Sequence, residues 1–127
     1  MIRLSFLGKS IFAAIRGAAH VWRSEQNFRI QIFAGLLAIV LAVMARLELW
    51  KLITIILLVA MVLILEVVNS VFERLLDLIK SRLHPSVRDM KDMLAAAVLL
   101  ASLTALGIGV VFFLPWLRTV FLFTRGG

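Results

Sequence analysis

Five polar residues recur at helical spacing in a segment that is otherwise apolar. At about 100° per residue of an α-helix they fall within an arc of about 100°, so they share one face. We call them the polar stripe: Glu66, Asn69, Ser70, Glu73 and Asp77. Apolar residues cover the rest of the helix circumference, except for Arg74 at the edge of the stripe.

Carboxylates in this setting could serve as a general base and as cation ligands. The stripe follows residues 52–65, which carry no charge, a pattern typical of a helix leaving a membrane. Ionisable groups at membrane depth cost about 2.5–3.5 kcal/mol on insertion scales, so they are expected to face protein or a wet cavity. Glu66, the deepest acid, is suited to accept a proton. Glu73 and Asp77, nearer the water, could bind Mg²⁺ through oxygen.

Single members of this set also allow simpler interpretations. Asn69 and Ser70 could only join helices by hydrogen bonds, as such residues often do in membranes. Glu73 could pair with a neighbouring arginine. Two further polar elements are expected at the same membrane face, Glu25 and the Lys91-Asp92 pair, although a lysine at a cytoplasmic helix start is also a common topology signal.

Composition indicates a membrane protein rather than a soluble domain. Hydrophobic residues make up 63% of the 127-residue chain and the mean hydropathy is +1.08, against about 45–50% apolar residues in soluble domains. The net charge is +7, but the charges flank apolar runs, which favours anionic lipid headgroups over nucleic acid. The absence of cysteine excludes disulfides, thiolate metal sites and a cysteine nucleophile.

The hydropathy pattern predicts an all-α membrane protein with a single domain, residues 1–127. Basic residues interrupt the apolar positions near the N-terminus, which favours a retained amphipathic surface helix over a signal peptide. The expected elements are this helix at about residues 3–22 and three crossings at about 28–46, 49–81 (with a cytoplasmic extension) and 90–117.

Turn residues and charge complete this prediction. His84-Pro85 is expected to form a turn with a solvated histidine, and Pro115-Trp116 to mark the far interface. Five basic residues precede the first crossing and five lie between the second and third, against two in the first turn and two at the C-terminus. The positive-inside rule then places the N-terminus in the cytoplasm and the C-terminus outside.

Three separated motifs resemble the prokaryotic diacylglycerol kinase / undecaprenol kinase family over about residues 5–116. The polar stripe matches the family pattern E-x-x-N-[ST]-A-I-E-x-x-x-D. Upstream, an E-x-N-F-R-I element is present, and downstream an H-P pair precedes K-D at the start of an alanine-rich helix. These elements comprise Glu25, Asn27, Phe28, Arg29, Ile30, His84, Pro85, Lys91 and Asp92.

The resemblance implies a homotrimer in a prokaryotic cell membrane, with active sites between neighbouring subunits. It implies ATP-dependent, Mg²⁺-dependent phosphorylation of the primary hydroxyl of a membrane lipid alcohol. Glu66 would be the catalytic base, and Glu25 with Glu73 would hold the metal and nucleotide. The same resemblance assigns the surrounding nucleotide site to Asn69, Asp77, Lys91 and Asp92.

The acceptor lipid and two other functions stay open at this point. The H-P pair and the E-x-N-F-R-I element look more like the undecaprenol kinase branch, with diacylglycerol as the alternative acceptor. Four departures from the family pattern bear on this choice: Val71, Phe72, Leu94 and Ala96. No Walker loop or protein-kinase motif is present. A small transporter using the acids as a cation relay, or a structural oligomer, would explain the acids without ATP turnover.

Overall fold

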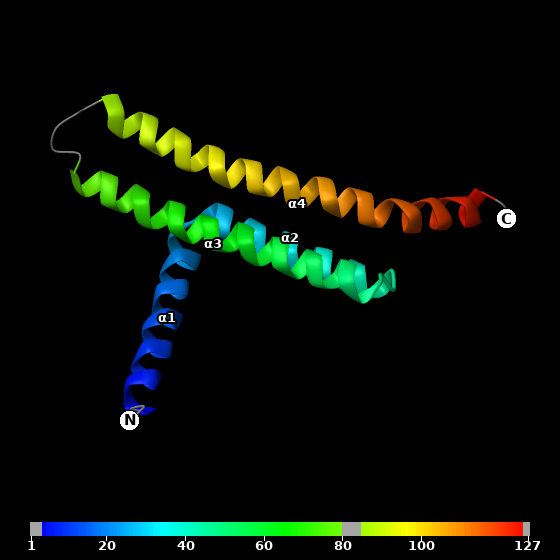
Figure 1. The fold of residues 1–127 in the computed structure, drawn as a ribbon, viewed down its shortest axis with the longest axis horizontal. Coiled ribbons are helices and arrows are strands. Elements are labelled where there is room, and N and C mark those ends of the chain that lie inside the picture. The colour runs from blue at the N-terminus through cyan, green and yellow to red at the C-terminus, as the bar shows by residue number, and fades with distance from the viewer. Residues whose placement is uncertain (1–3, 80–84, 126–127) are drawn as a thin grey trace.

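The computed structural model describes residues 4–79 and 85–125, which form four α-helices (Figure 1). These are α1 (Leu4–Ser24), α2 (Gln26–Met44), α3 (Leu49–Ile79) and α4 (Pro85–Arg125). The last three are each long and apolar enough to cross a membrane. Figure 1 shows them running side by side while α1 points away from them. The predicted all-α membrane fold with a separate N-terminal helix is confirmed.

The fourth helix is longer than expected at both ends. It begins at Pro85, because proline is favoured at the first helical position, where its missing N–H costs nothing. His84 of the expected turn lies outside the described residues. Pro115 lies inside α4 and does not end it, as is common in membrane helices, although Figure 1 shows a bend toward the C-terminal end.

The first helix is amphipathic and leaves its apolar side uncovered. Ile11, Phe12 and Ile15 are each about 60% exposed in the protomer. The guanidinium of Arg16 lies 4.9 Å from the centre of the Phe12 ring, so a basic side chain borders the apolar face. An apolar face bordered by basic residues is typical of a helix that lies in the membrane interface. At its end, Trp22 contacts Phe33 of α2, with ring centres 5.9 Å apart.

Helices α2 and α3 pack along seams with a seven-residue repeat. The buried non-polar positions are Phe28, Gly35 and Ala42 on α2, and Ile55, Val62 and Leu76 on α3. A seven-residue repeat keeps the same face of each helix on its partner and favours a small left-handed crossing angle. At the middle of the seam Gly35 makes room for the side chain of Val59, because a Cβ atom at Gly35 would lie 2.5 Å from Cγ1 of Val59.

A tight turn joins the far ends of α2 and α3. Arg46 has φ 49°, and the N–H groups of Arg46 and Leu47 donate to the carbonyl oxygens of Val43 and Ala42, both at 3.0 Å. This is a Schellman motif with arginine where glycine is usual. Next to it, the Glu48 carboxylate accepts hydrogen bonds from Lys51 and Trp50, which lower the pKa of Glu48.

The close approach at Gly35 predicts a position-specific loss of stability. Gly35→Ala forces Val59 to shift, which should cost about 1–3 kcal/mol and outweigh the higher helix propensity of alanine. Gly107→Ala on α4 is the matched control, since nothing lies within 4 Å of a Cβ placed there. In detergent unfolding titrations Gly35→Ala should be less stable than the parent, Gly107→Ala at least as stable, and Val59→Ala should rescue the first. Equal stability of the two alanine variants would show that α2 and α3 are not in close contact.

Candidate active site

The polar stripe of α3 is turned toward α2 at its buried end. Glu66 and Ser70 are only 3% and 2% exposed, Asn69 and Glu73 are half-buried, and Asp77 is exposed. Val71 and Phe72, two of the departures from the family pattern, are 56% and 44% exposed on other faces of the helix. The stripe therefore passes from protein interior to water along one side of α3.

Gln31 of α2 provides the buried contact of Glu66. Its side-chain Nε2 donates a hydrogen bond of 3.1 Å to Oε2 of Glu66. From the sequence, no role was assigned to Gln31, which lies inside the first predicted crossing. The available signal was that Gln31 is the sole polar residue between positions 30 and 45, and a polar side chain at membrane depth is expected to find a partner.

A one-residue break between α1 and α2 brings Glu25 to the stripe. Glu25 has extended backbone (φ −105°, ψ 115°) and its side chain does not cap α2. Instead Oε1 of Glu25 accepts hydrogen bonds from the hydroxyls of Ser70 and Ser24, both at 3.1 Å. Glu25 is therefore joined by a hydrogen bond to the stripe that carries Glu66, although the two acids are 41 positions apart in the chain.

Arg74 of α3 binds the end of α1 and the break at Glu25 through side-chain contacts. Its Nη2 donates to Ser24 Oγ at 2.6 Å and to Glu25 Oε1 at 3.3 Å, and its Nη1 contacts Nε2 of His20. All three donors to Glu25 meet the same oxygen, Oε1. From the sequence, Arg74 was only a basic residue at the edge of the stripe. Its role depends on the position of α1, which helical periodicity does not give.

Asn69 and Glu73 form a second amide–carboxylate pair, one turn beyond the first. Nδ2 of Asn69 donates to Oε1 of Glu73 at 3.1 Å. In both pairs the amide oxygen, Oδ1 of Asn69 and Oε1 of Gln31, is buried without a hydrogen-bond partner among the described residues. Buried unpaired acceptors are rare and costly in native proteins, so such an oxygen is a natural place for a ligand, an ion or a water molecule to bind.

At the water-exposed end of the stripe, Asp77 pairs with α4. Nζ of Lys91 lies 2.6 Å from Oδ1 of Asp77, which ties α3 to the start of α4. Asp92 is exposed, and no hydrogen bond within the described part of the chain joins it to the stripe. The structure thus brings Glu25, Asn69 and Glu73 close to Glu66, places the Asp77–Lys91 pair farther out, and leaves Asp92 apart.

The oxygen donors fit a hard cation that needs few protein ligands. Glu25, Glu73 and the unpaired amide oxygen of Asn69 are the kind of ligand that Mg²⁺ prefers. Within residues 4–79 and 85–125 no three acidic or histidine side chains converge on one point. The usual Mg²⁺ site of nucleotide enzymes needs only one or two carboxylates, which phosphate oxygens and water complete.

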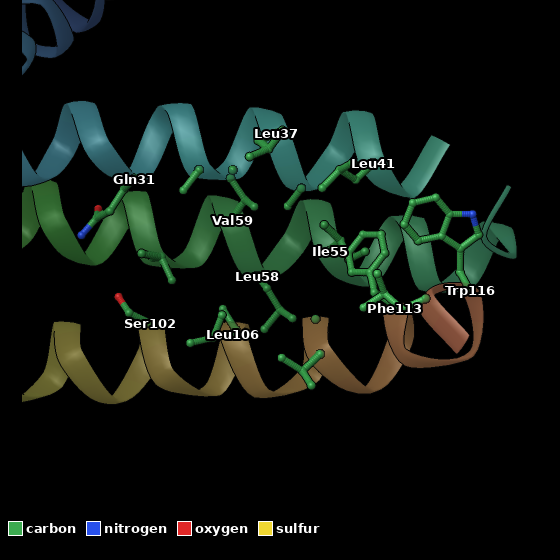
Figure 2. Close-up of a pocket in the computed structure, with 18 residues that line it drawn as sticks. Gln31, Leu37, Leu41, Ile55, Leu58, Val59, Ser102, Leu106, Phe113 and Trp116 are labelled. Carbon is green, nitrogen blue, oxygen red and sulfur yellow. The ribbon is translucent and has the colours of Figure 1, made fainter. Parts of the chain in front are cut away.

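An apolar pocket of about 530 Å³ opens beside the first amide–carboxylate pair, between α2, α3 and α4 (Figure 2). Gln31 and Ser102 lie at one end, and Phe113 and Trp116 at the other (Figure 2). Along α2 the lining extends from Gln31 to Leu41, which is about 15 Å at 1.5 Å per residue. Gln31, which lines this cavity, therefore links it to the Glu66 carboxylate through one hydrogen bond.

Comparison with known proteins agrees with this combination of features. The family model of prokaryotic diacylglycerol kinase matches residues 12–113. An undecaprenol kinase of Bacillus subtilis is 31% identical over 107 residues, covering 84% of this chain and 87% of that protein. Diacylglycerol kinases of Escherichia coli K12 and Synechocystis are 36% and 33% identical over 90 and 100 residues.

Coverage differs among these relatives. The match covers 71% of this chain and 74% of the Escherichia coli protein, but it spans only 57% of the length of the Synechocystis protein. All three relatives are named lipid kinases. Since the family model covers most of its length, the chain belongs to the prokaryotic diacylglycerol kinase family of membrane lipid kinases.

Proposed function

We propose that this chain transfers the γ-phosphoryl group of ATP to the primary hydroxyl of a membrane lipid alcohol, with Glu66 as the catalytic base. The observation that carries the proposal is the place of Glu66, which is buried and hydrogen-bonded to Gln31, a residue that lines one end of an apolar pocket. A lipid chain in that pocket would bring its hydroxyl to a carboxylate. The remaining acids lie on the side toward water, where a nucleotide can enter.

The reaction is a direct displacement. The lipid hydroxyl oxygen attacks the γ-phosphorus while its proton passes to the Glu66 carboxylate. A new phosphorus–oxygen bond forms, the bond to the β,γ-bridging oxygen breaks, and ADP leaves with that electron pair. Glu66 then releases its proton to solvent. In such reactions positioning and electrostatic stabilisation supply most of the catalysis, so a preorganised base matters.

Glu25 and Glu73 are proposed to hold Mg²⁺, with the amide oxygen of Asn69 as a further ligand. When bound, the cation would neutralise negative charge on the phosphates. Arg74 keeps one oxygen of Glu25 occupied and so orients the other. Lys91 is already paired with Asp77, so nucleotide phosphates would meet this ion pair rather than a free lysine. Asp92 is assigned to the nucleotide side by resemblance alone.

The protein is proposed to work as a homotrimer with active sites between subunits. In the single protomer only 6% of the α4 span is buried, against 17% for α2 and for α3, so most of α4 is available to neighbouring chains and lipid. Loop charges favour a multi-pass protein of the prokaryotic cell membrane, with the N-terminus in the cytoplasm and the C-terminus outside.

Undecaprenol is the proposed acceptor, with diacylglycerol as the second candidate. The E-x-N-F-R-I element from Glu25 to Ile30 supports undecaprenol by resemblance. Relatives of both names are 31–36% identical to this chain, so identity does not separate the two.

Removing the proposed base should abolish most of the activity. Glu66→Gln preserves size and hydrogen bonding but cannot take up the proton, so kcat should fall about 10²- to 10⁴-fold, the usual contribution of general base catalysis. The assay follows ATP-dependent phosphorylation of a lipid alcohol by protein in bicelles. Glu48→Gln, at the far turn, is the control and should keep parental activity. Near-normal turnover of Glu66→Gln would remove Glu66 from this role.

Acceptor choice can be measured by competition. Undecaprenol and diacylglycerol are supplied in the same bicelles at equal mole fraction with labelled ATP, and the two phosphorylated products are separated. We expect a higher kcat/KM for undecaprenol. A preference for diacylglycerol would identify the second candidate as the acceptor. The absence of label in both lipids would contradict the kinase proposal itself.

A further inference from the structure

The two ends of the Gln31 amide have different environments. Nε2 donates to Glu66, while Oε1 is buried and has no hydrogen-bond partner among the described residues. Gln31 also lines the apolar pocket (Figure 2). The pairing with Glu66 fixes the orientation of the amide, because an ionised carboxylate can only accept a hydrogen bond. This orientation leaves Oε1 without a donor among the described residues.

An unpaired acceptor at the end of an apolar pocket selects for a ligand that brings one donor. Leaving such an oxygen unpaired destabilises the folded protein. The apolar lining excludes ligands with many polar groups. A lipid alcohol supplies what is missing, one hydroxyl hydrogen at the end of a hydrocarbon chain.

We propose that Gln31 recognises the acceptor lipid. Its Oε1 accepts a hydrogen bond from the lipid hydroxyl, while its Nε2 holds Glu66 in position to take the hydroxyl proton. This inference rests on the proposed function. The hydroxyl hydrogen is shared between Gln31 Oε1 and the Glu66 carboxylate until it moves to Glu66 during transfer. The chain of the lipid lies in the pocket toward Phe113 and Trp116.

The same arrangement disfavours the product. After transfer the former hydroxyl oxygen is bonded to phosphorus and carries no hydrogen. The phosphorylated lipid then presents negative charge to a carbonyl oxygen and to a neighbouring acid, so Gln31 discriminates between alcohol and phosphate ester. An amide that both accepts from the substrate and donates to the base links lipid binding to base orientation.

The test separates lipid recognition from folding and from nucleotide binding. Gln31→Met has a similar length but neither hydrogen-bonding end. Its kcat/KM for the lipid alcohol should fall about 10- to 100-fold, through a higher lipid KM and a lower kcat, while the KM for ATP changes less than about twofold. Gln26→Met, an exposed glutamine at the start of α2, is the control and should match the parent.

Gln31→Asn is a second variant, which keeps the amide but shortens the side chain by one methylene group. It is used for the test if Gln31→Met does not fold. It should also raise the lipid KM more than the ATP KM. Lipid kcat/KM within about threefold of the parent in a folded Gln31 variant, or equal losses toward lipid and ATP, would overturn the assignment while leaving the kinase activity of the parent intact. A parent that phosphorylates no lipid would overturn the proposed function first.

Discussion

The structure depends on keeping the Glu66 carboxylate inside a membrane-crossing helix pair. An acid at this depth is costly unless it faces protein and has hydrogen-bond donors. Gln31 provides the donor, and it reaches Glu66 because α2 and α3 pack closely along the seam that includes Gly35 and Val59. Helix packing and the hydrogen bonding of this acid therefore depend on each other, since loosening the seam would move the Gln31 amide away from Glu66.

The exposure of the remaining polar groups increases along α3, from the end where a lipid would bind to the end where a nucleotide would bind. Burial decreases from Glu66 to Asp77, while the apolar pocket extends in the opposite direction toward Trp116. The break at Glu25 adds an acid from the N-terminal part of the chain, and Arg74 holds it there through Oε1. One helix face thus connects hydrocarbon to water, which suits a phosphoryl transfer between an apolar acceptor and a charged donor.

Much of this arrangement was predictable because two periodicities dominate the sequence. Long apolar runs define the crossings, and the 100° repeat groups Glu66, Asn69, Ser70, Glu73 and Asp77 on one side of a helix. Periodicity describes single helices, so it gave no partner for Gln31 and no role for Arg74, whose contacts join different helices. The length of α4 was underestimated because Pro115 was taken as a boundary, whereas a proline removes one backbone hydrogen bond without necessarily ending a helix.

The most direct measurement of the central claim is a protection experiment with a hydrophobic carbodiimide, which reaches carboxyl groups in apolar surroundings. Labelled peptides are mapped by mass spectrometry in bicelles with and without the lipid alcohol. We expect that Glu66 is labelled and that the lipid alcohol protects it, while Glu48, which is exposed at the far turn and not in apolar surroundings, stays unlabelled. Labelling of Glu66 that is unchanged by the lipid alcohol would contradict the claim that the lipid hydroxyl meets this carboxylate.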